Sequence, residues 1–165
     1  MIIRNEERRD IPAIRSINEN AFGRPDEADL VDSLRSEGAV LGSLVAEMQD
    51  QAVGHILFSR MWIDTIAGPV PAVALAPMAV LTEFQRQGIG QRLVRHGLDL
   101  MRSQGERIVI VLGHPHYYPR FGFSVEKARY LESPFPPEAF MALELIPGAL
   151  TGVQGKVRYP DAFGL

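Results

Sequence analysis

The chain has 165 residues, of which 46% are hydrophobic and 22% are charged, a composition typical of a globular protein with a sizeable core. Its formal net charge of -3 argues against a protein that binds nucleic acid through its overall charge. Cysteine is absent, which excludes disulfides, thiolate metal ligands and a cysteine nucleophile and is compatible with the cytoplasm. No apolar run reaches the roughly 20 residues that span a bilayer, and no signal-peptide core follows Met1. We therefore expect a single cytoplasmic domain over residues 1–165, without nucleic-acid or membrane partners.

The N-terminal part predicts a short strand over residues 1–4 and then two helices. Asp10 is expected to cap the first helix, while Asp26 is expected to cap the second, which ends at Gly38. Apolar residues recur at helical spacing in both segments: Ile11, Ile14, Ile17 and Ala21 in the first, and Leu30, Val31 and Leu34 in the second.

Further strands follow in the middle of the chain. Residues 41–48 and 52–63 predict a hairpin that turns at Asp50 and Gln51. A second turn at residues 67–69 leads to the strand that we expect at the centre of the sheet.

That central strand begins a strand, loop and helix that extend from Val73 to Gly105. The strand is apolar up to Val80, and Pro77 removes one donor, which predicts an edge, a bulge or a splayed strand. The helix after the loop is amphipathic and ends at Gly105; Ile89, Leu93, Gly97 and Met101 recur along its apolar side. Residues 107–112 predict the next strand, parallel to the central one in a right-handed unit.

The loop between strand and helix carries Gly88 and Gly90, which permit a tight turn and the close approach of a ligand to the backbone. Unpaired N–H groups and the dipole at the helix start favour a phosphate there. Three arginines add positive charge: Arg86, Arg92 and Arg95. A dinucleotide-binding loop would have a third glycine where Leu93 stands, and the Gly-Lys-Ser/Thr ending of a P-loop is absent. A plain connector has the same glycine pattern, so the glycines alone leave both interpretations open.

A second polar cluster follows the strand that ends at Leu112. It contains His114, His116, Tyr117 and Tyr118, and ligands commonly bind at the ends of strands in open sheets. Tyr118 is either a catalytic group or a packed aromatic residue whose hydroxyl is bound to the backbone. The two histidines lack further ligands at a metal-binding spacing, so we expect no metal.

The C-terminal part is irregular. Residues 133–137 predict a rigid proline-rich loop, and residues 140–145 and 155–159 predict two further strands.

The central stretch resembles the acetyl-CoA motif of the GCN5-related N-acetyltransferases. That motif, Gln/Arg-x-x-Gly-x-Gly/Ala after a strand, corresponds to Gln85–Gly90 after Met78-Ala79-Val80. The Tyr-x-x-x-Gly-Phe sequence from Tyr118 to Phe123 resembles the second signature of the family. Four further segments resemble its YhbS-type branch of uncharacterised members: FGRPDEADLV, YYPRFGF, LELIPGAL and KVRYP.

The resemblance implies an α/β fold with a mixed, mostly antiparallel sheet of about six to seven strands, flanked by helices, in which a central parallel pair is splayed. It also implies acetyl-CoA as cosubstrate, with Tyr118 near the thioester sulfur as general acid. The implied cofactor-binding residues are Met78, Ala79 and Val80 for the pantetheine arm, and Gln85, Arg86, Gln87, Gly88, Ile89, Gly90 and Gln91 for the pyrophosphate.

The expected reaction is transfer of an acetyl group to a primary amine of a small molecule or a protein by direct attack. His55, His116 and Glu27 are candidate bases, as is water, although His55 in its apolar strand is more typical of a buried structural histidine. The acceptor is expected between the first two helices and the C-terminal loops. The acidic segment 26–37 either attracts a cationic amine or is a solvated helix face.

Two other function classes remain open. A non-catalytic acyl-CoA-binding sensor would keep Gln85–Gly90 and would not need Tyr118, and a structural protein would need neither. We expect a monomer or a homodimer.

Overall fold

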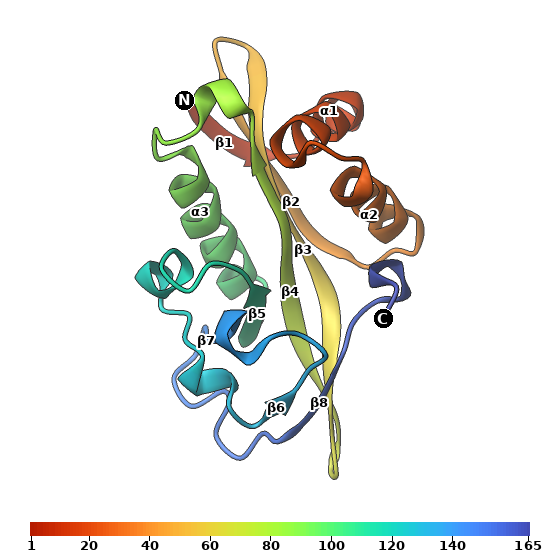
Figure 1. Cartoon of the computed structure of the whole chain (residues 1–165), viewed down its shortest axis with the longest axis vertical. Coiled ribbons are helices and arrows are strands. Elements are labelled where there is room, and N and C mark those ends of the chain that lie inside the picture. The colour runs from red at the N-terminus through yellow and green to blue at the C-terminus, as the bar shows by residue number, and fades with distance from the viewer.

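A computed structural model, which describes residues 1–165, contains one open sheet with helices on both faces (Figure 1). Helices α1 (Ile11–Phe22) and α2 (Asp26–Ser36) cover one face, and α3 (Ile89–Ser103) covers the other. The strands are β1 (Ile2–Asn5), β2 (Val40–Met48), β3 (Gln51–Thr65), β4 (Gly68–Val80), β5 (Ile108–Leu112), β6 (Leu131–Glu132), β7 (Phe140–Glu144) and β8 (Gly155–Arg158). Short 3-10 helices lie at η1 (Arg8–Asp10), η2 (Thr82–Phe84), η3 (Tyr118–Phe121), η4 (Glu126–Ala128), η5 (Pro137–Ala139) and η6 (Asp161–Phe163).

The sheet has eight strands, and six of them follow the order β1-β2-β3-β4-β5-β7. Strand β8 pairs with β3 beyond the end of β2 and also with β6. Only β4–β5 and β6–β8 are parallel pairs, so the predicted mixed, mostly antiparallel sheet is confirmed. The expected number of strands was too small because β6 has two residues, too few to produce a periodic pattern.

Both predicted hairpin turns are displaced by one residue. The first turn consists of Gln49 and Asp50, whose φ angles of 51° and 63° place both in the left-handed conformation that matches the twist of paired strands. In the second hairpin Thr65 pairs with Gly68, so β4 begins five residues before Val73. Pro69 and Pro71 of this extension lie two residues apart, so both face the same edge of β4. They face the edge away from β3, where β5 does not reach, so their missing N–H donors leave no partner unpaired.

The predicted helix caps are wrong in their mechanism, although the helices start where expected. Neither Asp10 nor Asp26 accepts a hydrogen bond from the helix that it was expected to cap. The Asp10 carboxylate instead accepts hydrogen bonds from the Glu7 N–H at 2.7 Å and from Arg4 at 2.7 and 2.9 Å. Asp10 therefore connects the first 3-10 turn to β1.

The core consists of three clusters, of which the second largest, with 12 buried residues, joins β3, β4, β5 and β7 to the C-terminal segments that carry Leu131 and Val157. On the α3 side, Leu93, Val94 and Met101 pack against apolar residues of β2–β5 and β7. Gly97 gives α3 its close approach to the sheet, because a Cβ there would lie 2.3 Å from the ring of Phe58. On the other side, α1 and α2 bury a smaller cluster: Ile14, Val31, Leu34, Val45 and Leu57.

Strands β4 and β5 separate in the middle of the sheet. They pair only at Val73–Val109 and Ala74–Ile110, yet β4 continues to Val80. The predicted splay is confirmed, but it begins at Ala74, before Pro77. The predicted bulge is also present, since the β3–β4 register shifts opposite Pro77, whose peptide bond with Ala76 is cis. The separation leaves one edge of β4 without a partner strand.

Candidate active site

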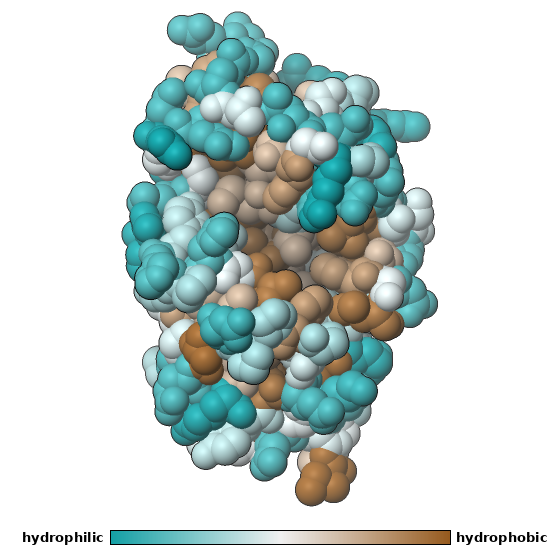
Figure 2. Space-filling model, in the orientation of Figure 1, coloured by the Kyte–Doolittle hydropathy of each residue, from teal (hydrophilic) through white to brown (hydrophobic).

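A cavity of about 570 Å³ opens where β4 and β5 separate. Figure 2 shows it as an apolar hollow with a largely hydrophilic rim. Its walls come from α1 and α2, from β4, from the loop and first turn of α3, and from the segment after β5. The sequence-predicted residues that line it are Met78, Ala79, Val80, Gln85, Arg86, Gly88, Ile89, Gly90, Gln91 and Tyr118. Gln87 is the exception, since its side chain is exposed outside the lining.

The loop and first turn of α3 contain a row of unpaired backbone donors, and all of these residues except Gln87 line the cavity. Residues 86–91 donate no backbone hydrogen bond within the protein, and the first paired N–H is that of Arg92, 3.2 Å from the Gly88 oxygen. These donors lie at the positive end of the dipole of a 15-residue helix. The arrangement suits an anion such as phosphate.

The two glycines of the loop have different roles. Gly88 has a φ of 84°, which disfavours any side chain, and its Cβ would meet nothing within 4 Å. A Cβ on Gly90 would lie 3.0 Å from the Tyr117 hydroxyl and 3.2 Å from the Met78 Cε. Gly90 therefore makes room for neighbouring side chains of the protein, a role that the sequence pattern did not reveal.

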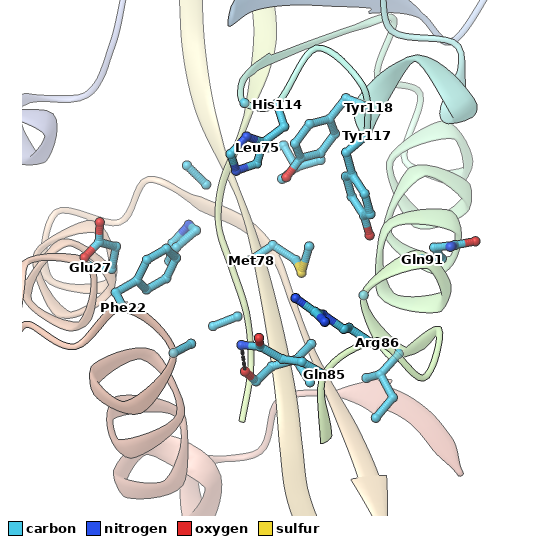
Figure 3. A pocket seen from close by; sticks show the side chains of 18 of the residues that line it. Phe22, Glu27, Leu75, Met78, Gln85, Arg86, Gln91, His114, Tyr117 and Tyr118 are labelled. Atoms are coloured by element: carbon cyan, nitrogen blue, oxygen red, sulfur yellow. Dashed lines mark hydrogen bonds between the residues drawn. The ribbon is translucent and has the colours of Figure 1, made fainter. Parts of the chain in front are cut away.

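The polar side chains of the loop also have different roles. Gln85 donates from Nε2 to the Val80 oxygen at 2.9 Å, so its carboxamide holds the loop on the end of β4 (Figure 3). Arg86 points into the cavity, with a left-handed φ of 64°. Arg92 and Arg95, which were expected to reinforce the anion site, do not line the cavity, and Arg95 lies over the Phe121 ring at 5.1 Å.

The backbone of β4 forms the floor of the cavity. The Leu81 N–H donates to the Val53 oxygen at 2.9 Å, and pairing in an antiparallel ladder alternates from that point. Ala79 therefore bonds to β3, whereas Met78 and Val80 turn their N–H and C=O groups toward the open edge. Since Gln85 occupies the Val80 oxygen, the Val80 N–H and both Met78 groups remain for a ligand.

Tyr118 lies in the far wall with its hydroxyl toward the cavity (Figure 3). Its ring is 9% exposed and packs edge-on against Tyr117 at 5.1 Å and Phe123 at 5.7 Å. Gly113 permits this position, because a Cβ there would lie 2.3 Å from the ring. The hydroxyl makes no hydrogen bond within the protein, which contradicts the interpretation that it is bound to the backbone. Burial raises the pKa of Tyr118 to about 12, so the phenol is a protonated donor at neutral pH.

Of the candidate bases, only Glu27 reaches the cavity. His55 is fully buried outside the lining, where Nδ1 lies 3.3 Å from Asn18 Nδ2 and Nε2 lies 2.9 Å from Ser43 Oγ. Burial lowers the pKa of His55 to about 3, which fits the structural interpretation. His116 is exposed outside the lining.

The acidic segment 26–37 is largely neutralised within the protein. Arg15 binds Asp29 at 2.9 Å and Asp32 at 2.8 Å, while Arg24 binds Glu27 at 2.6 Å. This supports the interpretation as a helix face over that of a cation-attracting surface.

Other residues of the cavity escaped the sequence analysis as ligand contacts. Tyr117 and His114 lie in the segment after β5, and Ala21, Phe22 and Leu30 come from α1 and α2. The sequence showed the polar cluster after β5 and the apolar spacing of the two helices. It did not show which of these side chains face the cavity.

No group of three or more His, Asp or Glu side chains is placed to hold a metal ion. No helix has both the length and the apolar character to cross a membrane.

Sequence comparison relates the chain to known acetyltransferases. Residues 11–123 match the profile of the acetyltransferase (GNAT) family. YjhQ of Escherichia coli strain K12, described as an uncharacterized N-acetyltransferase, is 43% identical over 116 residues, which cover 69% of this chain and 64% of YjhQ. YhbS of the same strain, described in the same way, is 34% identical over 166 residues, covering 99% of this chain and 98% of YhbS.

Solved structures agree in fold. The crystal structure of Escherichia coli YhbS in complex with CoA has a TM-score of 0.91 at 34% identity and covers 99% of this chain and 92% of that one. A GNAT family acetyltransferase from Brucella melitensis in complex with acetyl-CoA has a TM-score of 0.81 at 35% identity, covering 98% and 97%. Both similarities extend over nearly the whole chain and so include all four walls of the cavity.

Proposed function

The chain belongs to the acetyltransferase (GNAT) family, and from this premise we propose that it transfers an acetyl group from acetyl-CoA to a primary amine of a small molecule or a protein by direct attack. One observation carries the proposal: the residues with unpaired donors at Arg86 and 88–91, the open edge of β4 and Tyr118 all line one cavity. The CoA and acetyl-CoA complexes of the two similar structures support the choice of cosubstrate.

The loop and first turn of α3 hold the pyrophosphate in this proposal. The free N–H groups of Arg86 and of residues 88–91 donate to its oxygens, and the Arg86 side chain adds a cation. Gln85 acts indirectly by holding the loop on β4. Gln87 does not line the cavity, so in this proposal the pyrophosphate is held by its neighbours in the loop.

The pantetheine arm lies along the open edge of β4. Its amides replace the missing neighbouring strand and pair with the free groups of Met78 and the Val80 N–H, while Ala79 keeps its pairing with His55. This places the thioester beyond Met78, toward the wall that contains Tyr118. An N–H group on this edge can also polarise the thioester carbonyl.

Tyr118 assists the leaving group. As nitrogen attacks, the C–N bond forms, the C–S bond breaks and charge develops on sulfur. A thiolate whose thiol has an ordinary pKa of about 8.5 is too weak a base to remove the proton of a phenol with a pKa of about 12 outright. Tyr118 therefore donates a hydrogen bond to the sulfur, which stabilises the transition state more than the bound substrate.

Cosubstrate binding is tested by calorimetry with CoA and with pantetheine, which lacks the pyrophosphate. We expect CoA to bind at least about 10²-fold more tightly, since several charge-assisted hydrogen bonds are lost in pantetheine. Equal affinity would refute the anion site. The matched variant is Arg86→Gly, which removes the cation and suits the left-handed φ, so CoA affinity should fall while the fold is retained.

Catalysis is tested with acetyl-CoA and a panel of alkylamines, polyamines and lysine-containing peptides, with acetylated products detected by mass spectrometry. Tyr118→Phe should lower turnover by about 10²-fold without weakening CoA binding. Tyr117 lines the cavity and is therefore unsuitable as a control; Tyr130, which is 56% exposed, supplies the control Tyr130→Phe. CoA binding without transfer to any amine would favour the sensor.

A further inference from the structure

We propose that His114 is the general base of the reaction, taking the proton from the acceptor amine. The proposal rests on the proposed function and supplies the base that the sequence analysis left open. Five titratable side chains line the cavity: Glu27, Arg86, His114, Tyr117 and Tyr118.

Four of these five groups are poor proton acceptors at neutral pH. Arg86 is a permanent cation. Burial raises the pKa of both Tyr117 and Tyr118, which keeps the phenols protonated. Glu27 accepts two hydrogen bonds from Arg24, at 2.9 and 2.6 Å, and this pairing lowers its pKa and weakens it as a base.

His114 has the geometry that the role requires. Its backbone oxygen accepts hydrogen bonds from the N–H groups of Tyr117 at 3.0 Å and Tyr118 at 3.3 Å, so one turn holds the imidazole and the phenol. In Figure 3 the imidazole points into the cavity beside the Tyr118 hydroxyl, across from Phe22 and Glu27. The ring makes no hydrogen bond within the protein, and both nitrogens are free for a substrate.

The chemistry balances with one base. A neutral imidazole takes one proton from the ammonium form of the acceptor, and the free amine attacks the thioester carbonyl. The C–N bond forms, the C–S bond breaks and the electron pair leaves on sulfur, which receives a hydrogen bond from Tyr118. The nitrogen loses its second proton as the amide forms, and the sulfur gains one to become the thiol. Because His114 is exposed at the cavity mouth, it releases its proton to solvent before the next turnover.

The pH dependence involves every charged group facing the cavity. Glu27 faces His114 from α2, Arg86 faces it from the loop, and the two tyrosines adjoin it. Over pH 5.5–8 the carboxylate, the guanidinium and the phenols keep their charge states, because none has an ordinary pKa in that window. An acidic limb in the pH profile of kcat/KM is therefore the signature expected of a histidine base in this cavity.

The test compares His114→Gln with the control His116→Gln, a neighbouring exposed histidine outside the cavity. The acceptor is the panel amine with the highest wild-type turnover. We expect His114→Gln to lower kcat by about 10²-fold at pH 7 and to flatten the acidic limb of kcat/KM, while CoA affinity and the control stay at wild-type values. A His114→Ala variant should regain activity when imidazole is added to the assay.

The outcomes separate this proposal from the proposed function. Active wild-type protein together with an active His114→Gln variant that keeps the acidic limb would overturn the role of His114 alone. Wild-type protein that acetylates no amine in the panel would overturn the proposed function, and the base with it. Loss of activity in His114→Ala without rescue, accompanied by weaker CoA binding, would show a positioning role and overturn the proposal.

Discussion

The buried histidine of β3 should make the protein sensitive to mild acid. Ser43 Oγ donates to Glu6 at 2.8 Å, so it accepts from His55 Nε2–H, and His55 Nδ1 accepts from the Asn18 amide. A second proton would place an N–H on Nδ1 against that amide donor, in a site with no exposure. Burial, reinforced by the charge of Arg35, lowers the pKa of His55 from 6.5 to about 3.

The sign and size of the effect follow from this shift. Between about pH 6.5 and pH 3 the unfolded chain binds a proton at His55 that the folded protein does not, so the free energy of unfolding falls as pH falls. At pH 5.0 the loss relative to pH 7.5 is RT ln(1 + 10^1.5), about 2 kcal/mol. Asp10, with its pKa lowered to about 2 by Arg4, contributes little in this range because it titrates at lower pH in both states.

Urea denaturation at pH 7.5 and pH 5.0 measures the difference. Wild-type protein and the control His96→Gln, at an exposed position of α3, should both lose about 2 kcal/mol. His55→Gln should lose much less, whatever its stability at pH 7.5. Equal losses in all three proteins would refute the reasoning. NMR gives a second measurement that needs no variant, since the His55 ring signals should not titrate above about pH 4.

Three other perturbations test the packing around the site. Gly97→Ala should destabilise the protein by about 1–2 kcal/mol in urea denaturation, because overpacking against Phe58 at 2.3 Å outweighs the roughly 1 kcal/mol gain in helix propensity; a more stable variant would contradict the packing. Gly113→Ala should lower turnover by about 10- to 100-fold with the Tyr118 hydroxyl still present, since the ring must move away from a Cβ at 2.3 Å; unchanged kcat would mean that the ring position does not matter. Gln85→Ala should weaken CoA binding through the loop while leaving turnover at saturating acetyl-CoA close to wild type, because its carboxamide binds Val80; equal losses in affinity and turnover would indicate a direct role.

The segment from His114 to Phe123 shows which site residues a local sequence pattern can and cannot identify. The Tyr-x-x-x-Gly-Phe spacing singled out Tyr118, which lines the cavity with its hydroxyl unpaired. The same segment contained His114 and His116; the sequence analysis named His116 as a candidate base, whereas the structure places only His114 in the lining of the cavity. Neighbouring residues of an irregular turn point in different directions, and the turn at His114–Tyr118 is fixed by backbone hydrogen bonds that spacing does not encode.

The sequence by itself determined the order of strand, loop and helix, the left-handed turn at Gly88 and the amphipathic face of α3, because each depends on residues a few positions apart. Only the tertiary structure decided where β4 and β5 separate, that Gly90 makes room for Tyr117, and that the Gln85 carboxamide donates its hydrogen bond to the Val80 oxygen. These features depend on contacts between segments that the chain brings together after folding. The register of one strand against another determines which side chains face the cavity. That register cannot be predicted from the periodicity within a single segment.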